Sequence, residues 1–520
     1  MIVDEVFKAY CAPLSARGSG LVFAVAFGST SFGKSEGEND GSARSLLTLA
    51  RSGTTVEEMI SKDEVRSKAL ELDIEPANVE RDYVFGWLLN GIYSMSRLKD
   101  VLVLKGGNAF RKAYFPNTRF SNDLDFSTQA AIDETFLVAE LNRVCEYVQN
   151  ATGVVFETDR TQVEEKPFAH TTRRIYQARL YFKDFFGNPD SITISVRLDI
   201  AEFDRVYLPV QTRNLIHPYS DQAQCTAAIR CLKLEELLAL KLKCLLQRRH
   251  SFDLYDYVHA IFINNELAVD RGEIVRTFLK RTIFEPSPGV VANLLLGLPF
   301  EVFRAAWNRY IVSPKTSRID FETALTQFSA SVHDLFGSLS TGYGELAYFP
   351  AELRNPIIDA GCGMKLIAIT YEGARRVCEP YSLVYKRRKD GHGQEYLYVW
   401  DRTGGHTSDP GIKTFVHSKI EGLEPLEERF EPRFPVELSK AGEYGDRTYF
   451  GKPFGAGRVA SVGRQSLTRR VYGGVTYVIE CIYCGKQFRR RTTTTRLRKH
   501  KDRYGNSCFG RGGRLVDRIY

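Results

Sequence analysis

The spacing of apolar residues predicts where regular structure begins. Between about residues 80 and 92 they recur at helical spacing, and the apolar run 101–104 that follows is typical of a buried strand. Gly106-Gly107 ends that strand, and a helix is expected from about Ala109. In residues 119–127 polar and apolar side chains alternate, which predicts a half-buried strand.

The remaining pattern divides the chain into parts. Residues 133–149 and 234–248 are expected to be helices, the stretch 154–198 antiparallel strands, and the residues up to about 335 further helices. Beyond residue 364 short strands alternate with turns, which predicts a small twisted sheet or barrel. The expected parts are a poorly defined segment 1–70, a core 75–265, a helical region 266–340, a β domain 364–434, a Gly-rich linker 435–470 and a tail 471–520.

Length and composition narrow the class of protein. A chain of 520 residues is long enough for several domains, and 43% hydrophobic with 26% charged residues is typical of a globular protein. No apolar run approaches the roughly 20 residues that cross a bilayer. The ten cysteines form no dense disulfide framework. We therefore expect a cytoplasmic protein with no membrane partner.

The positive charge is concentrated at the end of the chain. Residues 481–520 hold 12 Lys and Arg against 2 Asp and Glu, whereas the whole chain has a formal net charge of only +8. A near-neutral body with a strongly basic end is typical of a protein that meets polyanions, most often nucleic acid.

Two carboxylates share one face of the strand expected at 119–127. Because side chains alternate along a strand, Ser121, Asp123 and Asp125 point to one side, and the two Asp lie about 7 Å apart. Such a pair is unfavourable unless a cation lies between them, and hard oxygen ligands at this spacing suit Mg²⁺. An exposed acidic strand end beside a turn is the alternative interpretation.

Later segments offer further charged groups. Asp199 lies with Arg197 on the polar face of the strand that ends at Ile200, where it supplies a third carboxylate or faces solvent. Lys241 leans on the apolar stripe of its helix and needs an anion to face, unless its stem only packs along the helix edge. Asp253 and Asp256 are candidates to pair with Lys241 or to orient it toward a triphosphate.

Together these segments resemble the AbiEii/AbiGii toxin group of nucleotidyltransferases. The resemblance covers roughly residues 75–265 and rests on Lys105-Gly-Gly-Asn-Ala-Phe110, on Arg119-Phe-Ser-Asn-Asp-Leu-Asp-Phe126, and on Lys241 with Asp253-Leu-Tyr-Asp256. It implies an α+β protein with a DNA-polymerase-β-like core that transfers a nucleotidyl group from an NTP with Mg²⁺. Members typically act as the toxin of a toxin–antitoxin pair or in phage defence, so the resemblance also implies a cognate antitoxin.

The resemblance implies roles for individual residues. Gly106 and Gly107 would approach the phosphates, Ser121 would bind on the γ-phosphate side, and Lys105 and Arg119 join the expected nucleotide-binding set. Asp123 and Asp125 would hold metal, with Asp199 as the third candidate ligand, while Lys241 and Asp253 match the family's pair. Two departures, Asn108 in place of the common Thr and His250-Ser-Phe before Asp253 in place of an adjoining Arg, indicate that the phosphate contacts differ.

The β-rich residues 364–434 look like a WYL domain, a small SH3-like barrel of bacterial transcription regulators and defence proteins. Tyr396-Leu397 is kept, but Glu395 replaces the Trp of the family's name. The resemblance implies a sensor for a nucleotide or nucleic acid. A β domain that only packs against its neighbours is the alternative. The candidate phosphate contacts are Arg376, Lys386, Arg387 and Arg388.

The basic tail has the spacing of metal ligands. Cys481, Cys484, His500 and Cys508 give four ligands for one structural Zn²⁺, with His500 on a helix expected at 493–501. This arrangement resembles a C2HC variant of the C2H2 zinc finger. A disordered polybasic tail is the alternative. The candidate phosphate contacts are Arg489, Arg490, Arg491, Arg496, Arg498 and Lys499.

These features predict a nucleotidyltransferase joined to a β module and to a zinc finger that binds nucleic acid. The acceptor is expected to be an RNA, such as the 3′ end of tRNA, or a protein. The alternative is a nucleic-acid-binding regulator or defence sensor in which the transferase fold only binds nucleotide. The complete set of Ser121, Asp123, Asp125 and Asp199 favours the enzyme, because a fold that only binds nucleotide does not need the metal ligands.

Overall fold

The structure is a computed structural model. It describes residues 60–167, 174–184, 193–263, 267–340, 347–387, 393–404 and 409–443, and those of 476–519 other than 482, 483, 485, 491, 493, 502–506 and 509. Most of the segment 1–70 and of the linker 435–470 therefore lies outside the described residues.

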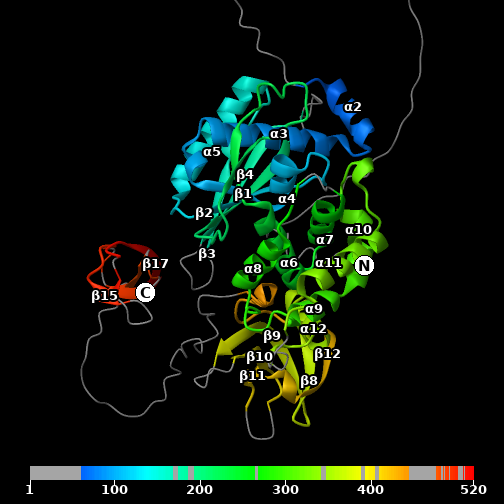
Figure 1. The fold of residues 1–520 in the computed structure, drawn as a ribbon, viewed down its shortest axis with the longest axis vertical. Coiled ribbons are helices and arrows are strands. Elements are labelled where there is room, and N and C mark those ends of the chain that lie inside the picture. Colours follow the sequence, from blue (N-terminus) through cyan, green and yellow to red (C-terminus); the bar gives the residue numbers. More distant parts are fainter. Residues whose placement is uncertain are drawn as a thin grey trace, which may run out of the picture. The chain divides into compact units, whose positions relative to one another are not determined.

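A seven-stranded mixed sheet forms the centre of the first part (Figure 1). The strand order is β3-β4-β5-β2-β1-β7-β6, in which β2 pairs with β5 and β1 with β7 in parallel, while the other neighbours are antiparallel. The strands are β1 Leu102–Lys105, β2 Asp123–Thr128, β3 Gln162–Pro167, β4 Arg174–Lys183, β5 Thr193–Glu202, β6 Gln211–Asn214 and β7 Ala228–Cys231.

Helices pack on the apolar face of this sheet. Helix α3, Pro76–Ser94, is buried along nearly all of its last three turns and contacts α2, Lys62–Leu72, and α5, Glu134–Thr152. Helix α5 begins where the Asp133 side chain accepts a hydrogen bond from the backbone of Phe136, and it ends at Gly153 with φ 77°. The expected helices near residues 80 and 133 are confirmed, and each ends two or three residues later than predicted.

A second group of helices continues the same hydrophobic core, which runs from Ile60 to Ala351. The expected helix at 234–248 is confirmed as α6. Among the described residues no single helix is long and apolar enough to cross a membrane, although α9 and α10 pass that test together as a pair bent by 58°. The group comprises α6 Leu234–Gln247, α7 Ser251–Val258, α8 Arg271–Arg281, α9 Val290–Leu296, α10 Phe300–Tyr310 and α11 Phe321–Phe336.

A small antiparallel sheet follows helix α12, Ala351–Cys362, in agreement with the β pattern of the sequence. Glu395 is fully buried there, accepts a hydrogen bond from Phe349 N and forms an ion pair with the buried Arg354 of α12. Arg376 is paired with Asp401. The strands, in the order β11-β10-β9-β8-β12, are β8 Lys365–Tyr371, β9 Ala374–Arg387, β10 Gly393–Asp401, β11 Gly411–Phe415 and β12 Ile420–Arg429.

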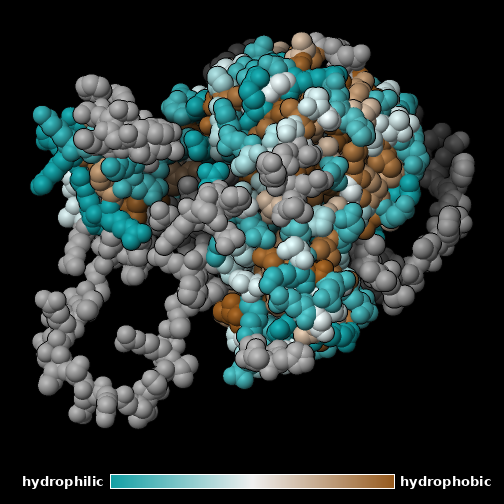
Figure 2. Space-filling model, turned by 60° about the horizontal axis from the view of Figure 1, so that its bottom comes forward, coloured by the Kyte–Doolittle hydropathy of each residue, from teal (hydrophilic) through white to brown (hydrophobic). Residues whose placement is uncertain are grey.

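The tail folds as short strands around a small core of its own. The expected helix at 493–501 is wrong, because the described residues there are irregular and end in the strand pair His500–Lys501 and Ser507–Cys508. Four consecutive Thr precede this pair, and β-branched side chains favour extended backbone. The tail, at the left of Figure 2, shows a mainly hydrophilic surface. Its strands are β13 Thr476–Cys481, β14 Gln487–Arg490, β15 His500–Lys501, β16 Ser507–Cys508 and β17 Gly513–Ile519.

Candidate active site and metal centres

Three carboxylates meet where β2 and β5 lie side by side. Asp125 and Asp199 are register partners, and Asp123 lies two residues before Asp125 on the same face. The residues between them, Leu124 and Leu198, are buried in the core, so the strand alternation turns the carboxylates to the other face. One oxygen of each Asp lies within 4.8 Å of the others. The predicted clustering of these three residues is therefore present.

The electrostatics of this triad fit a cation. Burial, together with the charges of Asp123 and Asp199, raises the pKa of Asp125 to about 7, although Lys105 and Arg248 oppose the rise. Arg197 Nη2 lies 2.5 Å from an oxygen of Asp123, and its Nε lies 3.3 Å from an oxygen of Asp199. One guanidinium therefore does not compensate three carboxylates. Oxygen ligands at this density are the ligand type that Mg²⁺ takes in proteins.

The start of helix α4, Gly106–Ala109, lies against the triad. Gly106 has φ 71°, and a side chain on it would collide with the Asp125 carboxylate. A Cβ on Gly107 would lie 2.6 Å from Ser121 Oγ. Ser121 in turn donates to Asp123 Oδ1 at 3.3 Å, and the buried Asn108 donates to the Asp123 carbonyl at 2.6 Å. The two glycines therefore allow the backbone to approach the carboxylates closely.

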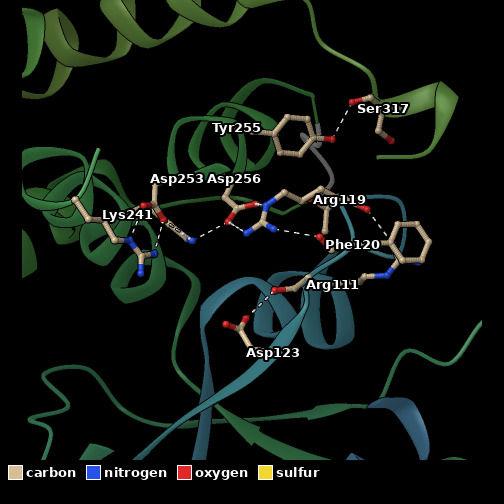
Figure 3. Close-up of polar contacts among 12 residues, drawn as sticks. Arg111, Arg119, Phe120, Asp123, Lys241, Asp253, Tyr255, Asp256 and Ser317 are labelled. Carbon is tan, nitrogen blue, oxygen red and sulfur yellow. Dashed lines mark hydrogen bonds and ion pairs between the residues drawn. The ribbon is translucent and has the colours of Figure 1, made fainter. Parts of the chain in front are cut away.

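Arg119, Lys241 and Asp253 belong to a buried row of ion pairs (Figure 3). Asp256 accepts from Arg119 Nε at 2.7 Å and pairs with Lys241 Nζ at 2.7 Å, and Lys241 also donates to Asp253 at 2.9 Å. Arg248 closes the row with two bonds of 2.8 Å to Asp253. The row thus holds α6 and α7 against the segment that enters β2.

Arg119 and Lys241, which were expected to bind nucleotide, both lie in this row, and their role in nucleotide binding stays a prediction. Both are at most 7% exposed, and both already face carboxylates, as in the alternative that paired Lys241 with Asp253 and Asp256. Burial would raise the pKa of Asp253, but Arg248 and Lys241 hold it well below its usual range. These groups therefore stay charged and fix the positions of their helices.

Lys105 is also paired within the protein. Its Nζ lies 2.7 Å from Asp204, which accepts a second bond of 2.7 Å from Ser127. Sequence analysis gave no role to Asp204, Arg197 or Arg248. Arg197 was detectable, because it precedes Asp199 by two residues on one strand face. No local pattern marks Asp204, which lies in a loop.

The four predicted zinc ligands come together in the tail. One ligand atom from each of Cys481, Cys484, His500 and Cys508 lies within 4.8 Å of the others. His500 Nδ1 is 2.9 Å from the Arg498 carbonyl, which fixes the tautomer that leaves Nε2 free to bind a metal. Nε2 itself lies 3.3 Å from Cys484 Sγ, and Gly510 N donates to Cys508 Sγ at 3.3 Å. Three thiols and one imidazole at this distance fit a tetrahedral Zn²⁺.

The basic residues of the tail differ in what they contact. Arg490 bonds to the carbonyls of Thr494 and Arg496, so it holds the tail together. Arg491 lies outside the described residues. Of the candidate phosphate contacts, Arg489, Arg496, Arg498 and Lys499 are exposed to solvent.

Residues 87–327 match the family model described as Nucleotidyl transferase AbiEii toxin, Type IV TA system. The matched stretch contains the carboxylate triad and the buried row of ion pairs, so this part of the chain is similar to AbiEii-type nucleotidyltransferases. Residues 475–501 match the BED zinc finger, a stretch that includes Cys481, Cys484 and His500 but stops before Cys508. No curated protein matches the chain.

Among solved structures, one similar chain is that of MenT4, described as nucleotidyltransferase toxin Rv2826c from Mycobacterium tuberculosis H37Rv. The two share 20% identity over 53% of this chain and 88% of that one, with a TM-score of 0.31. The family match confirms the nucleotidyltransferase core and the enzyme class that the sequence predicts. It ends before the small sheet of β8 to β12, whose likeness to a WYL domain stays a prediction.

Proposed function

We propose that the AbiEii-type domain transfers a nucleotidyl group from an NTP to an RNA acceptor, with Mg²⁺, as the toxin of a cytoplasmic toxin–antitoxin pair. The observation that carries this proposal is the triad of Asp123, Asp125 and Asp199, whose oxygens lie within 4.8 Å of each other. A fold that only bound nucleotide would have no need for three carboxylates that repel one another. Burial and the charges of Asp123 and Asp199 raise the pKa of Asp125, and a bound cation would relieve this repulsion.

The residues of the site would have different roles in the reaction. Asp123, Asp125 and Asp199 would hold Mg²⁺, which when bound neutralises charge on the transferring phosphoryl group and orients the attacking oxygen. The backbone N–H groups at Gly106 and Gly107 are positioned to bind the triphosphate at the start of α4. Asn108 and Ser121 hold Asp123 in place. The catalytic work of the protein is therefore placement and charge compensation.

The tail supports an RNA acceptor over a protein acceptor. We propose that Zn²⁺ holds the tail together through Cys481, Cys484, His500 and Cys508. The exposed Arg489, Arg496, Arg498 and Lys499 would then bind phosphates without reading sequence. Such a module raises the local concentration of RNA near the catalytic domain of the same chain.

The test is a transfer assay with the full chain. Purified protein is incubated with Mg²⁺, total cellular RNA and protein, and each of the four NTPs labelled on the α-phosphate. We expect label in RNA from one NTP or a few, no label with EDTA, and none with Asp125→Asn or Asp199→Asn. Asp63→Asn is the matched control, because its carboxylate is 91% exposed and remote from the triad in sequence.

Each other outcome contradicts a stated part of the proposal. Label in protein would mean that the acceptor is a protein and not RNA. Label that persists with Asp125→Asn would mean that the triad is not the catalytic site. No label from any NTP in wild-type protein would overturn the transferase reaction with these acceptors. Growth arrest on expression of wild-type protein, absent with Asp125→Asn, tests the toxin role separately.

A further inference from the structure

Two arginines lie directly opposite each other beside the carboxylate triad. Arg179 of β4 and Arg197 of β5 are register partners in an antiparallel pair. On its other side β5 pairs with β2, where Arg197 lies opposite Asp123. Register partners point to the same face, so the order across this face of the sheet is Arg179, Arg197, Asp123.

This arrangement of charge is unfavourable without an anion. Like charges directly opposite on neighbouring strands destabilise a sheet, since their Cβ atoms are about 4.5–5.5 Å apart. Arg197 is 40% exposed and forms ion pairs with Asp123 and Asp199. Arg179 is partly exposed and has no hydrogen-bond or ion-pair partner among the residues that the structure describes. A cation bound by Asp123 and Asp199 would remove the compensation from Arg197 as well.

The position of the pair separates it from the NTP phosphates. The glycines that would bind the triphosphate follow β1, which borders β2 on the side opposite to β5. Asp123 and Asp125 therefore lie between the glycines and the two arginines. An anion at Arg179 and Arg197 would therefore lie on the side of the triad away from the glycines, where the triphosphate does not compete with an acceptor.

The same face continues with chemistry that suits a nucleic acid. Tyr181 and Lys183 follow Arg179 at alternate positions of β4, and the Arg160 guanidinium lies 4.5 Å from the centre of the Tyr181 ring. On β3 the face carries both Glu164 and Lys166, whose charges cancel, so β3 does not compensate the arginine pair. Basic groups beside an aromatic ring are typical of surfaces that bind single strands.

The opposite face of β4 keeps the pair in place. Ala178, Leu180 and Phe182 are fully buried in the hydrophobic core, so the strand cannot turn to move Arg179 away from Arg197. We propose that Arg179 and Arg197 bind the phosphodiester backbone of the acceptor RNA next to its reacting end. This acceptor-strand site, defined by these two residues, rests on the proposed function.

Crosslinking tests the site without any transfer reaction. Full-length protein with Mg²⁺ is irradiated with single-stranded RNA that carries 4-thiouridine near its 3′ end, and the crosslinked peptides are mapped by mass spectrometry. We expect crosslinks in residues 174–202 that fall at least about fivefold with Arg179→Glu. Arg174→Glu is the matched control, because Arg174 lies on the same strand but on the other face, paired with Glu165. Crosslinks confined to residues 476–519 would overturn the site.

Kinetics give the second measurement. Arg179→Ala should raise KM for RNA about tenfold and leave KM for NTP unchanged. The plot of log affinity for RNA against log salt concentration should become shallower by about 0.7, the value for one lost phosphate contact. Equal changes in both KM values, or no change, would contradict the site. If wild-type protein transfers no label, the proposed function fails while the crosslinking result still stands on its own.

Discussion

Asp253 and Asp125 were both predicted to be catalytic, and the structure separates them by what their removal should do to stability. Asp253 is fully buried and accepts three bonds, one from Lys241 and two from Arg248. Asp253→Asn leaves Lys241 to share Asp256 with Arg119, so the buried row gains one uncompensated positive charge. Removing one partner of a buried ion pair costs about 3–5 kcal/mol. We therefore expect this loss in the free energy of unfolding at pH 7.

The loss is measurable by urea denaturation, followed by tryptophan fluorescence, because Trp87 and Trp307 are both buried in the core that contains the row. A loss of this size is a large part of the 5–15 kcal/mol typical of a folded domain. Adding Lys241→Met to Asp253→Asn should restore part of the stability, because it removes one of the two positive charges that would then share Asp256. Asp63→Asn, which changes an exposed carboxylate, should shift stability by less than about 0.5 kcal/mol.

Two results would refute the structural role of Asp253. One is a loss below about 1 kcal/mol in Asp253→Asn. The other is a double variant less stable than the single one, because that would mean Lys241 does not depend on Asp253 for compensation. Because the pKa of Asp253 is held well below its usual range, its contribution is fully present above pH 4 and disappears only as the pH falls through that low value. The effect should therefore be equal at pH 6 and pH 8.

Three further predictions concern the two metal centres and the glycine turn. Because the folded-state pKa of Asp125 is raised to about 7, metal-free protein should lose stability as pH rises from about 4 to 7. Asp125→Asn should abolish this loss of stability. Urea denaturation in EDTA at pH 5.5 and 8 measures it for both proteins. Cys484→Ser should release stoichiometric zinc, measured by mass spectrometry of metals, and leave the core melting unchanged; zinc content equal to wild type would count against the site. Gly107→Ala should raise KM for NTP at least about tenfold, because its Cβ would meet Ser121 Oγ at 2.6 Å; an unchanged KM would mean that this turn does not hold the phosphates.

The sequence by itself determined the local parts of the site. Strand alternation placed Asp123 and Asp125 on one face and buried Leu124, because that periodicity is a property of any extended chain. The Gly-Gly pair marked the end of the strand, and ligand spacing marked the zinc cluster. Each of these inferences needs only residues close together in sequence.

The sequence offered the pairing of Lys241 with Asp253 and Asp256 as one alternative, but only the tertiary structure decided the other charge pairs. Arg119 and Asp256 are 137 residues apart, so nothing in either segment shows that they pair. Arg179 meets Arg197 through strand pairing, which depends on the register of the whole sheet. In the tail, the helix expected at 493–501 is absent, and His500 is instead a strand partner of Cys508. The pairing of charges depends on which distant segments the fold brings together, whereas the alternation of side chains along a strand depends only on the local backbone.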